Sequence, residues 1–133
     1  WDTIQHAPYL SQMIALFKSE GIRVSIFVDP VVDMISAAAD TGTDRIELYT
    51  ESYASHYALD KEKAIKPYME AALQAQQLGI GINAGHDLSL ENLGYFYRSI
   101  PWIDEVSIGH ALICDALYLG LHNAVQMYKR ELV

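Results

Sequence analysis

Two histidines in the sequence each directly follow a glycine, in the pairs Gly85-His86 and Gly109-His110. Each pair comes after a short apolar run of the kind that forms a buried strand. Glycine allows the backbone to approach a ligand closely, and an imidazole can supply or accept a proton near neutral pH. The spacing therefore predicts a site that binds an anionic ligand and transfers protons.

A carboxylate lies inside another apolar run. Glu47 belongs to the sequence Arg-Ile-Glu-Leu-Tyr-Thr at residues 45–50. A carboxylate buried in a strand must be matched by a ligand, by a partner or by a raised pKa, so a functional role is expected. The alternative interpretation is a structural ion pair with Arg45 or Arg23.

The other titratable candidates are weaker. Asp29 ends an apolar run at residues 23–29, where it can belong to the site or can cap the helix that follows. His6, His56 and His122 lack a setting of this kind, and surface or packing roles are expected for them.

Neither a metal nor a cofactor is expected. Glu47, His86 and His110 form a set with two histidines and one carboxylate, which can bind a metal ion. The sequence has no close spacing such as HxH or HExxH, however, so a metal site is not predicted. Gly79 and Gly81 precede a strand instead of following one, which differs from a dinucleotide fingerprint.

The elements that must position these residues alternate between strands and helices. Strands are predicted at residues 23–29, 45–50, 80–84 and 105–108, and helices at residues 8–20, 31–40, 61–78, 90–99 and 116–132. Ser89 is expected to cap its helix, and the polar residues 51–60 are expected to form a functional loop. Alternating strands and helices indicate a parallel sheet, in which ligands bind at the carboxyl ends of the strands.

Two α/β architectures fit this order of elements. One is a doubly wound open sheet, and the other is part of a (β/α)8 TIM barrel, which needs about 250 residues. Four strand-helix units amount to half of such a barrel, and residues 1–133 are expected to form a single domain.

The composition narrows the class of protein. The chain has 133 residues, of which 51% are hydrophobic, and a formal net charge of -8. An acidic chain without clustered basic residues is a poor partner for nucleic acid, and no apolar run approaches the roughly 20 residues that cross a membrane. The single cysteine, Cys114, cannot form an internal disulfide, which favours the cytoplasm. Its apolar neighbours predict that Cys114 is buried.

Four segments of the sequence together resemble the pyridoxine 5'-phosphate synthase family. They are Arg-Val-Ser-Ile-Phe-Val-Asp at residues 23–29, Arg-Ile-Glu-Leu-Tyr-Thr at 45–50, Ile-Asn-Ala-Gly-His-Asp-Leu at 82–88 and Val-Ser-Ile-Gly-His-Ala-Leu-Ile at 106–113. The resemblance implies a (β/α)8 barrel, of which this chain supplies the C-terminal half, strands five to eight. The Asn-x-Asp-His and His-x-Arg segments of the family's N-terminal half are absent. The chain begins at Trp1 without signal-peptide features, so we interpret it as a cut chain and not as one that carries a targeting segment.

The resemblance also implies an activity and the residues that perform it. The family condenses 1-deoxy-D-xylulose 5-phosphate with 3-amino-2-oxopropyl phosphate, and forms pyridoxine 5'-phosphate, phosphate and water without a cofactor. By resemblance, His86 is the proton donor and Glu47 stabilises the transition state. Asp87, Gly109 and His110 match positions that bind the phosphorylated substrate or product. The family also assembles into homo-oligomers.

Two alternatives to the synthase remain open. One is a non-catalytic half-barrel module that binds a phosphorylated metabolite through Gly109 and His110, and the other is a different barrel enzyme that acts on a phosphosugar. The 133 residues alone are expected to be inactive. Half a barrel leaves two sheet edges unpaired, so self-association is expected.

Overall fold

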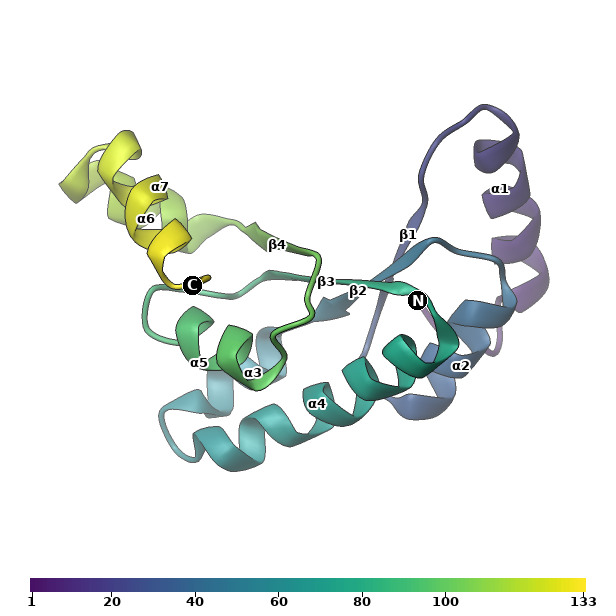
Figure 1. The fold of residues 1–133 in the computed structure, drawn as a ribbon, viewed down its shortest axis with the longest axis horizontal. Helices are drawn as coiled ribbons and strands as arrows, with labels where there is room; N and C mark the ends of the chain where they lie inside the picture. The colour runs from purple at the N-terminus through teal and green to yellow at the C-terminus, as the bar shows by residue number, and fades with distance from the viewer.

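A parallel four-stranded sheet forms the centre of the computed structural model, which describes residues 1–133 (Figure 1). The strands are β1 (Ser25–Val28), β2 (Arg45–Tyr49), β3 (Gly81–His86) and β4 (Glu105–Ile108). They lie in the order β1-β2-β3-β4, and each is parallel to its neighbour. A doubly wound sheet reverses its strand order at one point. These four strands contain no such reversal.

Helices from the middle of the chain cover one face of the sheet, and the last two helices pack against each other beyond the end of β4 (Figure 1). The helices are α1 (Ala7–Ser19), α2 (Val32–Asp40), α3 (Glu51–Tyr57), α4 (Lys61–Leu78), α5 (Leu93–Ser99), α6 (His110–Leu119) and α7 (Leu121–Arg130). Helices α2 and α4 pack against each other below the sheet, and α1 lies beside α2 (Figure 1). None of the helices combines the length and apolar character that crossing a membrane requires.

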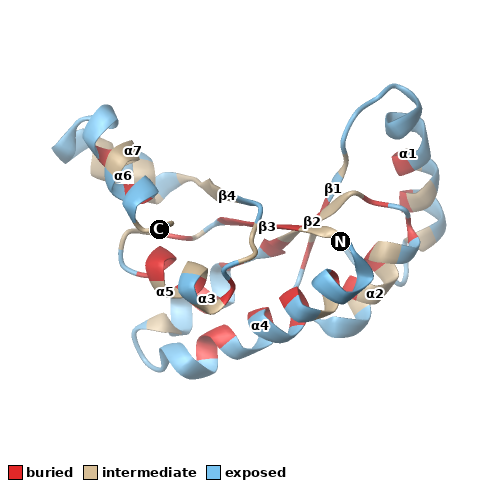
Figure 2. Cartoon of the chain, viewed as in Figure 1, coloured by how far each residue is buried: buried red, intermediate tan, exposed pale blue.

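Side chains alternate between the two faces of the sheet, as a period of two requires. The face toward the helices is apolar and buried (Figure 2), and it carries Ile26, Val28, Ile46, Leu48, Ile82 and Ala84. The opposite face carries polar and aromatic side chains in rows set by the strand register. One row consists of Phe27, Glu47, Asn83 and Glu105, and the next contains Tyr49, Gly85 and Ser107. We call this second face the open face.

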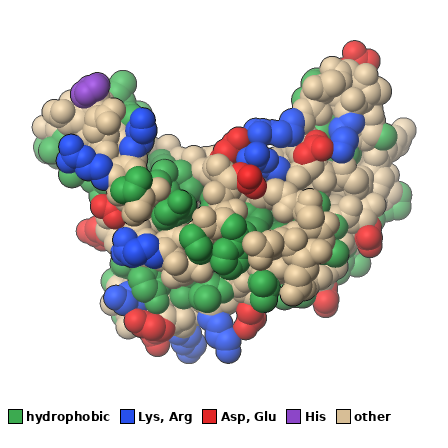
Figure 3. Space-filling model, in the orientation of Figure 1, with side chains coloured by type: hydrophobic (Ala, Val, Ile, Leu, Met, Phe, Trp, Pro, Cys, Tyr) green, Lys and Arg blue, Asp and Glu red, His purple; other side chains and the backbone are tan.

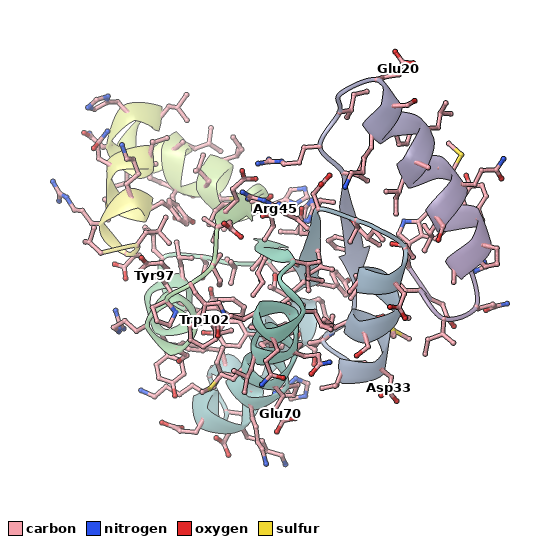
Figure 4. The ribbon with its side chains drawn as sticks, turned by 45° about the vertical axis from the view of Figure 1, so that its right-hand side comes forward. Glu20, Asp33, Arg45, Glu70, Tyr97 and Trp102 are labelled. Atoms are coloured by element: carbon pink, nitrogen blue, oxygen red, sulfur yellow. The ribbon has the colours of Figure 1, made fainter.

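Arg45 joins three strands across the open face, near the amino ends of the strands. Its guanidinium donates a hydrogen bond to Asn83 Oδ1 at 3.0 Å and lies 3.1 Å from Glu105 Oε1. Figure 4 shows Arg45 on the side of the sheet away from α4. The surface is hollowed between α1 and α6, and charged side chains gather at the base of this hollow (Figure 3).

An ion pair between the two outer strands shows that the sheet is curved. Arg23, which precedes β1, lies 2.9 Å from Glu105 at the start of β4. In a flat sheet, strands three places apart would be separated by about 14 Å. The contact therefore reflects a sheet that bends toward its open face.

The predicted loop at residues 51–60 is wrong, because most of it forms helix α3. Tyr53 on this helix is fully buried, with its ring centroid 4.9 Å from that of Phe96 and 5.8 Å from that of Tyr68. Its hydroxyl donates a hydrogen bond to the Asn92 carbonyl at 2.7 Å. Burial raises the pKa of Tyr53, and it raises the pKa of Tyr68 to about 12. This aromatic cluster orders a segment whose polar composition suggested a loop.

The C-terminal region also differs from the prediction. A single helix was expected at residues 116–132, but two helices form, and the first begins at His110. They are separated by Gly120, whose φ of 78° lies in the left-handed region that favours glycine. Cys114 is exposed and not buried, because α6 buries none of its residues.

The remaining elements are confirmed within a few residues. Helices α1 and α2 begin within one residue of the predicted start, and α4 matches its prediction. Strand β3 runs two residues beyond its predicted end and includes Gly85 and His86. Ser89 does not cap α5, which begins at Leu93 after Asn92, and its hydroxyl instead accepts a hydrogen bond from the Glu91 N–H at 3.3 Å.

Candidate active site

Glu47 and His86 meet at the carboxyl end of the sheet. Glu47 projects from β2 on the open face, and its Oε1 lies 3.6 Å from Nδ1 of His86, the last residue of β3. The Glu47 side chain is 19% exposed and that of His86 is 61% exposed. At this separation, which is longer than a hydrogen bond, the carboxylate lies beside one ring nitrogen of the imidazole. The other side of the ring remains accessible to a ligand.

Neither arginine that could neutralise Glu47 does so. Arg45 binds Asn83, Asp104 and Glu105, and Arg23 binds Glu105. The structural ion pair considered for Glu47 is therefore absent. Its nearest charged or ionisable partner across the open face is the His86 imidazole.

The backbone of His86 adopts an uncommon conformation. Its φ is 70°, and it is the only residue other than glycine with a positive φ. A side chain in this region costs on the order of 1–3 kcal/mol and persists only where the surroundings enforce it. Such strain concentrates at functional sites, which makes His86 the most distinctive residue of this edge.

Phe27 completes the contacts of His86, and sequence reasoning missed it. The Phe27 ring lies on β1 with its centroid 5.7 Å from that of His86 in an edge-to-face arrangement. It also contacts Tyr49, at 5.3 Å between centroids. Alternation within residues 23–29 places Phe27 opposite the buried Ile26 and Val28, so the signal for its orientation was present in the sequence.

Asp87 is held by its backbone. Its N–H donates to the Thr50 hydroxyl at 3.3 Å, and its carbonyl accepts from Asn92 Nδ2 at 3.3 Å. Carboxylate atom Oδ2 is buried and has no hydrogen-bond partner. Burying an unpaired acceptor is unfavourable, so this carboxylate oxygen lowers the stability of the fold.

Gly109 lies against His86, and His110 lies at the rim of the site. A Cβ atom added to Gly109 would be 3.6 Å from the His86 carbonyl oxygen and 4.0 Å from its Cδ2. His110 is the first residue of α6 and is exposed. Four of the five predicted site residues therefore lie next to one another: Glu47, His86, Asp87 and Gly109. The fifth, His110, follows Gly109 directly in the chain.

Other candidates fall outside this group. Asp29 is exposed at the end of β1, and its carboxylate makes no hydrogen bond or ion pair. No group of three His, Cys, Asp or Glu side chains is arranged so that it could hold a metal ion. A cavity of about 410 Å³ lies between Pro30, α3 and the start of α4. Its lining includes His56 and Lys63 but none of the predicted site residues.

The fold and the site define a class of protein. It is an α/β protein with a curved parallel sheet, an architecture in which ligands bind at the carboxyl ends of the strands, where a histidine, a carboxylate and glycine backbone lie here. The chain belongs to the family of the pyridoxal phosphate biosynthesis protein PdxJ, whose family model matches residues 1–133.

Curated relatives agree with this family. The pyridoxine 5'-phosphate synthase of Cytophaga hutchinsonii is 61% identical over 132 residues, which cover 99% of this chain and 56% of the relative. That of Christiangramia forsetii is 59% identical with the same coverage, and that of Parabacteroides distasonis is 57% identical over 97% of this chain and 54% of the relative. The chain thus spans about half the length of the curated relatives it matches.

Proposed function

We propose that the chain forms strands five to eight of a (β/α)8 barrel and carries part of the active site of a pyridoxine 5'-phosphate synthase. Two observations support the barrel: the consecutive parallel strand order and the curvature that brings Arg23 to Glu105. The relatives are about twice as long as the matched segment. The other four strands would therefore come from residues outside this sequence, and residues 1–133 act as one continuous half of the domain.

The contact between His86 and Glu47 carries the proposed activity. The reaction joins 1-deoxy-D-xylulose 5-phosphate to 3-amino-2-oxopropyl phosphate and closes a pyridine ring with loss of phosphate and water. Ring closure through imine formation and dehydration requires proton transfers, which a positioned histidine performs. His86 donates a proton to a departing or developing oxygen atom. Glu47 holds the imidazole in place and stabilises the transition state.

The remaining site residues bind the phosphorylated substrate or product. Gly109 brings backbone close to His86, and the amide groups that follow it open helix α6. Backbone amides at the start of a helix bind phosphate without a lysine, so the acidic balance of the chain is no obstacle. The exposed His110 imidazole supplies a further polar contact to the ligand, and Asp87, next to His86 in the chain, is proposed to contact the ligand as well.

We further propose that the complete protein is a cytoplasmic homo-oligomer and that the 133 residues alone are inactive. The outer edges of β1 and β4 have no strand beside them. Helix α6 exposes Leu117 and Tyr118, at 80% and 90% respectively. Unpaired edges and apolar side chains of this kind favour association with further strands or with a second copy.

A chimera tests the proposed activity. These 133 residues replace the matching segment of the Cytophaga hutchinsonii relative, and the two substrates are supplied. We expect formation of pyridoxine 5'-phosphate, measured by chromatography with mass detection. His86→Asn is expected to lower turnover by about 100-fold or more, the range of a lost general acid. His56→Asn, at an exposed residue of α3, serves as the matched control and is expected to leave turnover unchanged.

The outcomes separate the alternatives. A folded chimera that binds phosphate without turnover would support the non-catalytic binding module instead. A different product would identify another phosphosugar enzyme. If His86→Asn retained the turnover of the unmodified chimera, the proton donor would have to be another residue.

A further inference from the structure

Thr50 lies between the ends of two neighbouring strands and is completely buried. It follows β2 in the sequence, and its hydroxyl contacts Gly85 within β3 and Asp87 directly after β3. The hydroxyl donates a hydrogen bond to the Gly85 carbonyl and accepts one from the Asp87 N–H at 3.3 Å. One side chain therefore binds the peptide groups on both sides of His86.

This arrangement accounts for the conformation of His86. The Gly85 carbonyl and the Asp87 N–H are the backbone groups whose relative direction depends on the dihedral angles of the residue between them. A single hydroxyl that binds both groups restricts these angles, and here φ of His86 is 70°. Strained residues of this kind need such external restraint.

The loop after His86 is also anchored to the aromatic core. Asn92 donates to the Asp87 carbonyl at 3.3 Å, and its own carbonyl accepts from the Tyr53 hydroxyl at 2.7 Å. These bonds hold Asp87 but do not reach His86 or Gly85. Thr50 is thus the side chain that ties the backbone before His86 to the backbone after it.

We propose that Thr50 is a positioning residue: its hydroxyl holds His86 in the left-handed conformation that places the imidazole beside Glu47. The catalytic consequence rests on the proposed function, whereas the structural consequence does not. Without the hydroxyl, the strained backbone of His86 relaxes toward a negative φ. The imidazole then moves away from its position 3.6 Å from Glu47.

Two substitutions of Thr50 separate the hydroxyl from the shape of the side chain. Thr50→Val keeps the volume and removes the hydroxyl, while Thr50→Ser keeps the hydroxyl and removes a methyl group. Thr41→Val is a matched control, because Thr41 is also buried and its hydroxyl donates to the Ala38 carbonyl at 2.6 Å, away from the site. All three are made in the chimera with the Cytophaga hutchinsonii relative.

Two measurements read the effect. The first is the kcat and KM of the synthase reaction. The second is the nitrogen NMR spectrum of protein labelled at its histidines. The signals that are missing from the spectrum of His86→Asn are those of His86. We expect Thr50→Val to lower kcat by about 100-fold, as misplacement of a reacting group does, with little change in KM. It should also shift the His86 signals. Thr50→Ser keeps the hydroxyl, so kcat and the His86 signals should stay close to those of the unmodified chimera. Thr41→Val should change neither of them.

The results distinguish a positioning role from a structural one. If Thr50→Val lowers stability as Thr41→Val does but leaves kcat and the His86 signals unchanged, the proposal is overturned. If Thr50→Val does not fold, Thr50→Ala replaces it with the same expectations. If the chimera has no turnover but Thr50→Val still shifts the His86 signals, the proposed function fails and the positioning role stands.

Discussion

The Glu47 carboxylate occupies the space that a side chain at Gly85 would fill. The two residues lie on adjacent strands, and a Cβ atom added to Gly85 would collide with Glu47 Oε1 and lie 3.0 Å from Ser107 Cβ. The φ of Gly85 is not positive, so the glycine is needed here for space and not for an unusual backbone angle. It lets the carboxylate extend along the sheet as far as His86.

We expect Gly85→Ala to displace Glu47 and to lower the turnover of the chimera. Overpacking around Gly85 costs about 1–3 kcal/mol of stability, and misplacing a reacting group costs about 100-fold in rate. Urea unfolding and kcat measure the two effects separately.

A double-mutant cycle assigns the cause of this loss. In a Glu47→Ala background, Gly85→Ala has no carboxylate to displace, so it should lower kcat little further. Full additivity of the two substitutions would show that Gly85 acts through some other contact.

Tyr68→Phe is expected to destabilise the protein by about 1–3 kcal/mol, the cost of leaving buried polar groups unpaired. The Tyr68 hydroxyl donates to the Tyr49 carbonyl at 2.8 Å and accepts from the Tyr53 N–H at 3.2 Å. Chemical denaturation measures the change. Tyr118→Phe, at a residue that is 90% exposed, is the control and should have no effect.

Arg45→Met is expected to reduce stability while leaving kcat close to that of the unmodified chimera. Arg45 is 18% exposed and binds groups on β3 and β4, at the end of the sheet opposite the site. Charged hydrogen bonds of this kind contribute about 1.5–3 kcal/mol each. The exposed Arg130 gives the control, Arg130→Met. A large fall in kcat at unchanged stability would mean that Arg45 acts in the reaction.

Asp44 gives a prediction for acid pH. A hydrogen bond from Lys18 at 2.8 Å, and then one from the Val24 N–H at 2.9 Å, hold the pKa of this carboxyl below its usual 3.8. The carboxylate therefore stabilises the fold above pH 3.8, and this contribution disappears as the pH falls through the lowered pKa.

Denaturation at a series of pH values checks the sign of this effect. Asp44→Asn should be less stable than the unmodified chimera at neutral pH, and the difference should close in acid. Asp40→Asn, at an exposed carboxylate without a hydrogen bond, should show no such pH dependence. A difference that grows as the pH falls would contradict the prediction.

Local sequence pattern was sufficient to predict the strands. The run that contains Glu47 has the β-branched Ile46 in a buried position, and the run at 105–108 has Val106 and Ile108 in half-buried positions. Both runs form strands where expected. Because parallel strands end at one edge of a sheet, it was also predictable that Glu47, His86 and Gly109 would gather there.

Features that depend on tertiary contacts were not predictable. Helix α3 forms because Tyr53 packs against Tyr68 and Phe96, which are distant in sequence. The role inferred for Thr50 requires knowing that β2 lies beside β3 and in which register, since its hydrogen bonds span 35 residues to Gly85. A sequence pattern with a period of two contains neither fact.

The consecutive strand order has a consequence for the order of folding. Each strand pairs with the strand made just before it on the ribosome, so every pairing within this sheet joins neighbouring units of the chain. Contacts between segments close in sequence form quickly, which allows the units to assemble as they are synthesised. The ion pair between Arg23 and Glu105 spans 82 residues and cannot form until β4 has emerged. Its formation therefore marks the moment at which this sheet is complete.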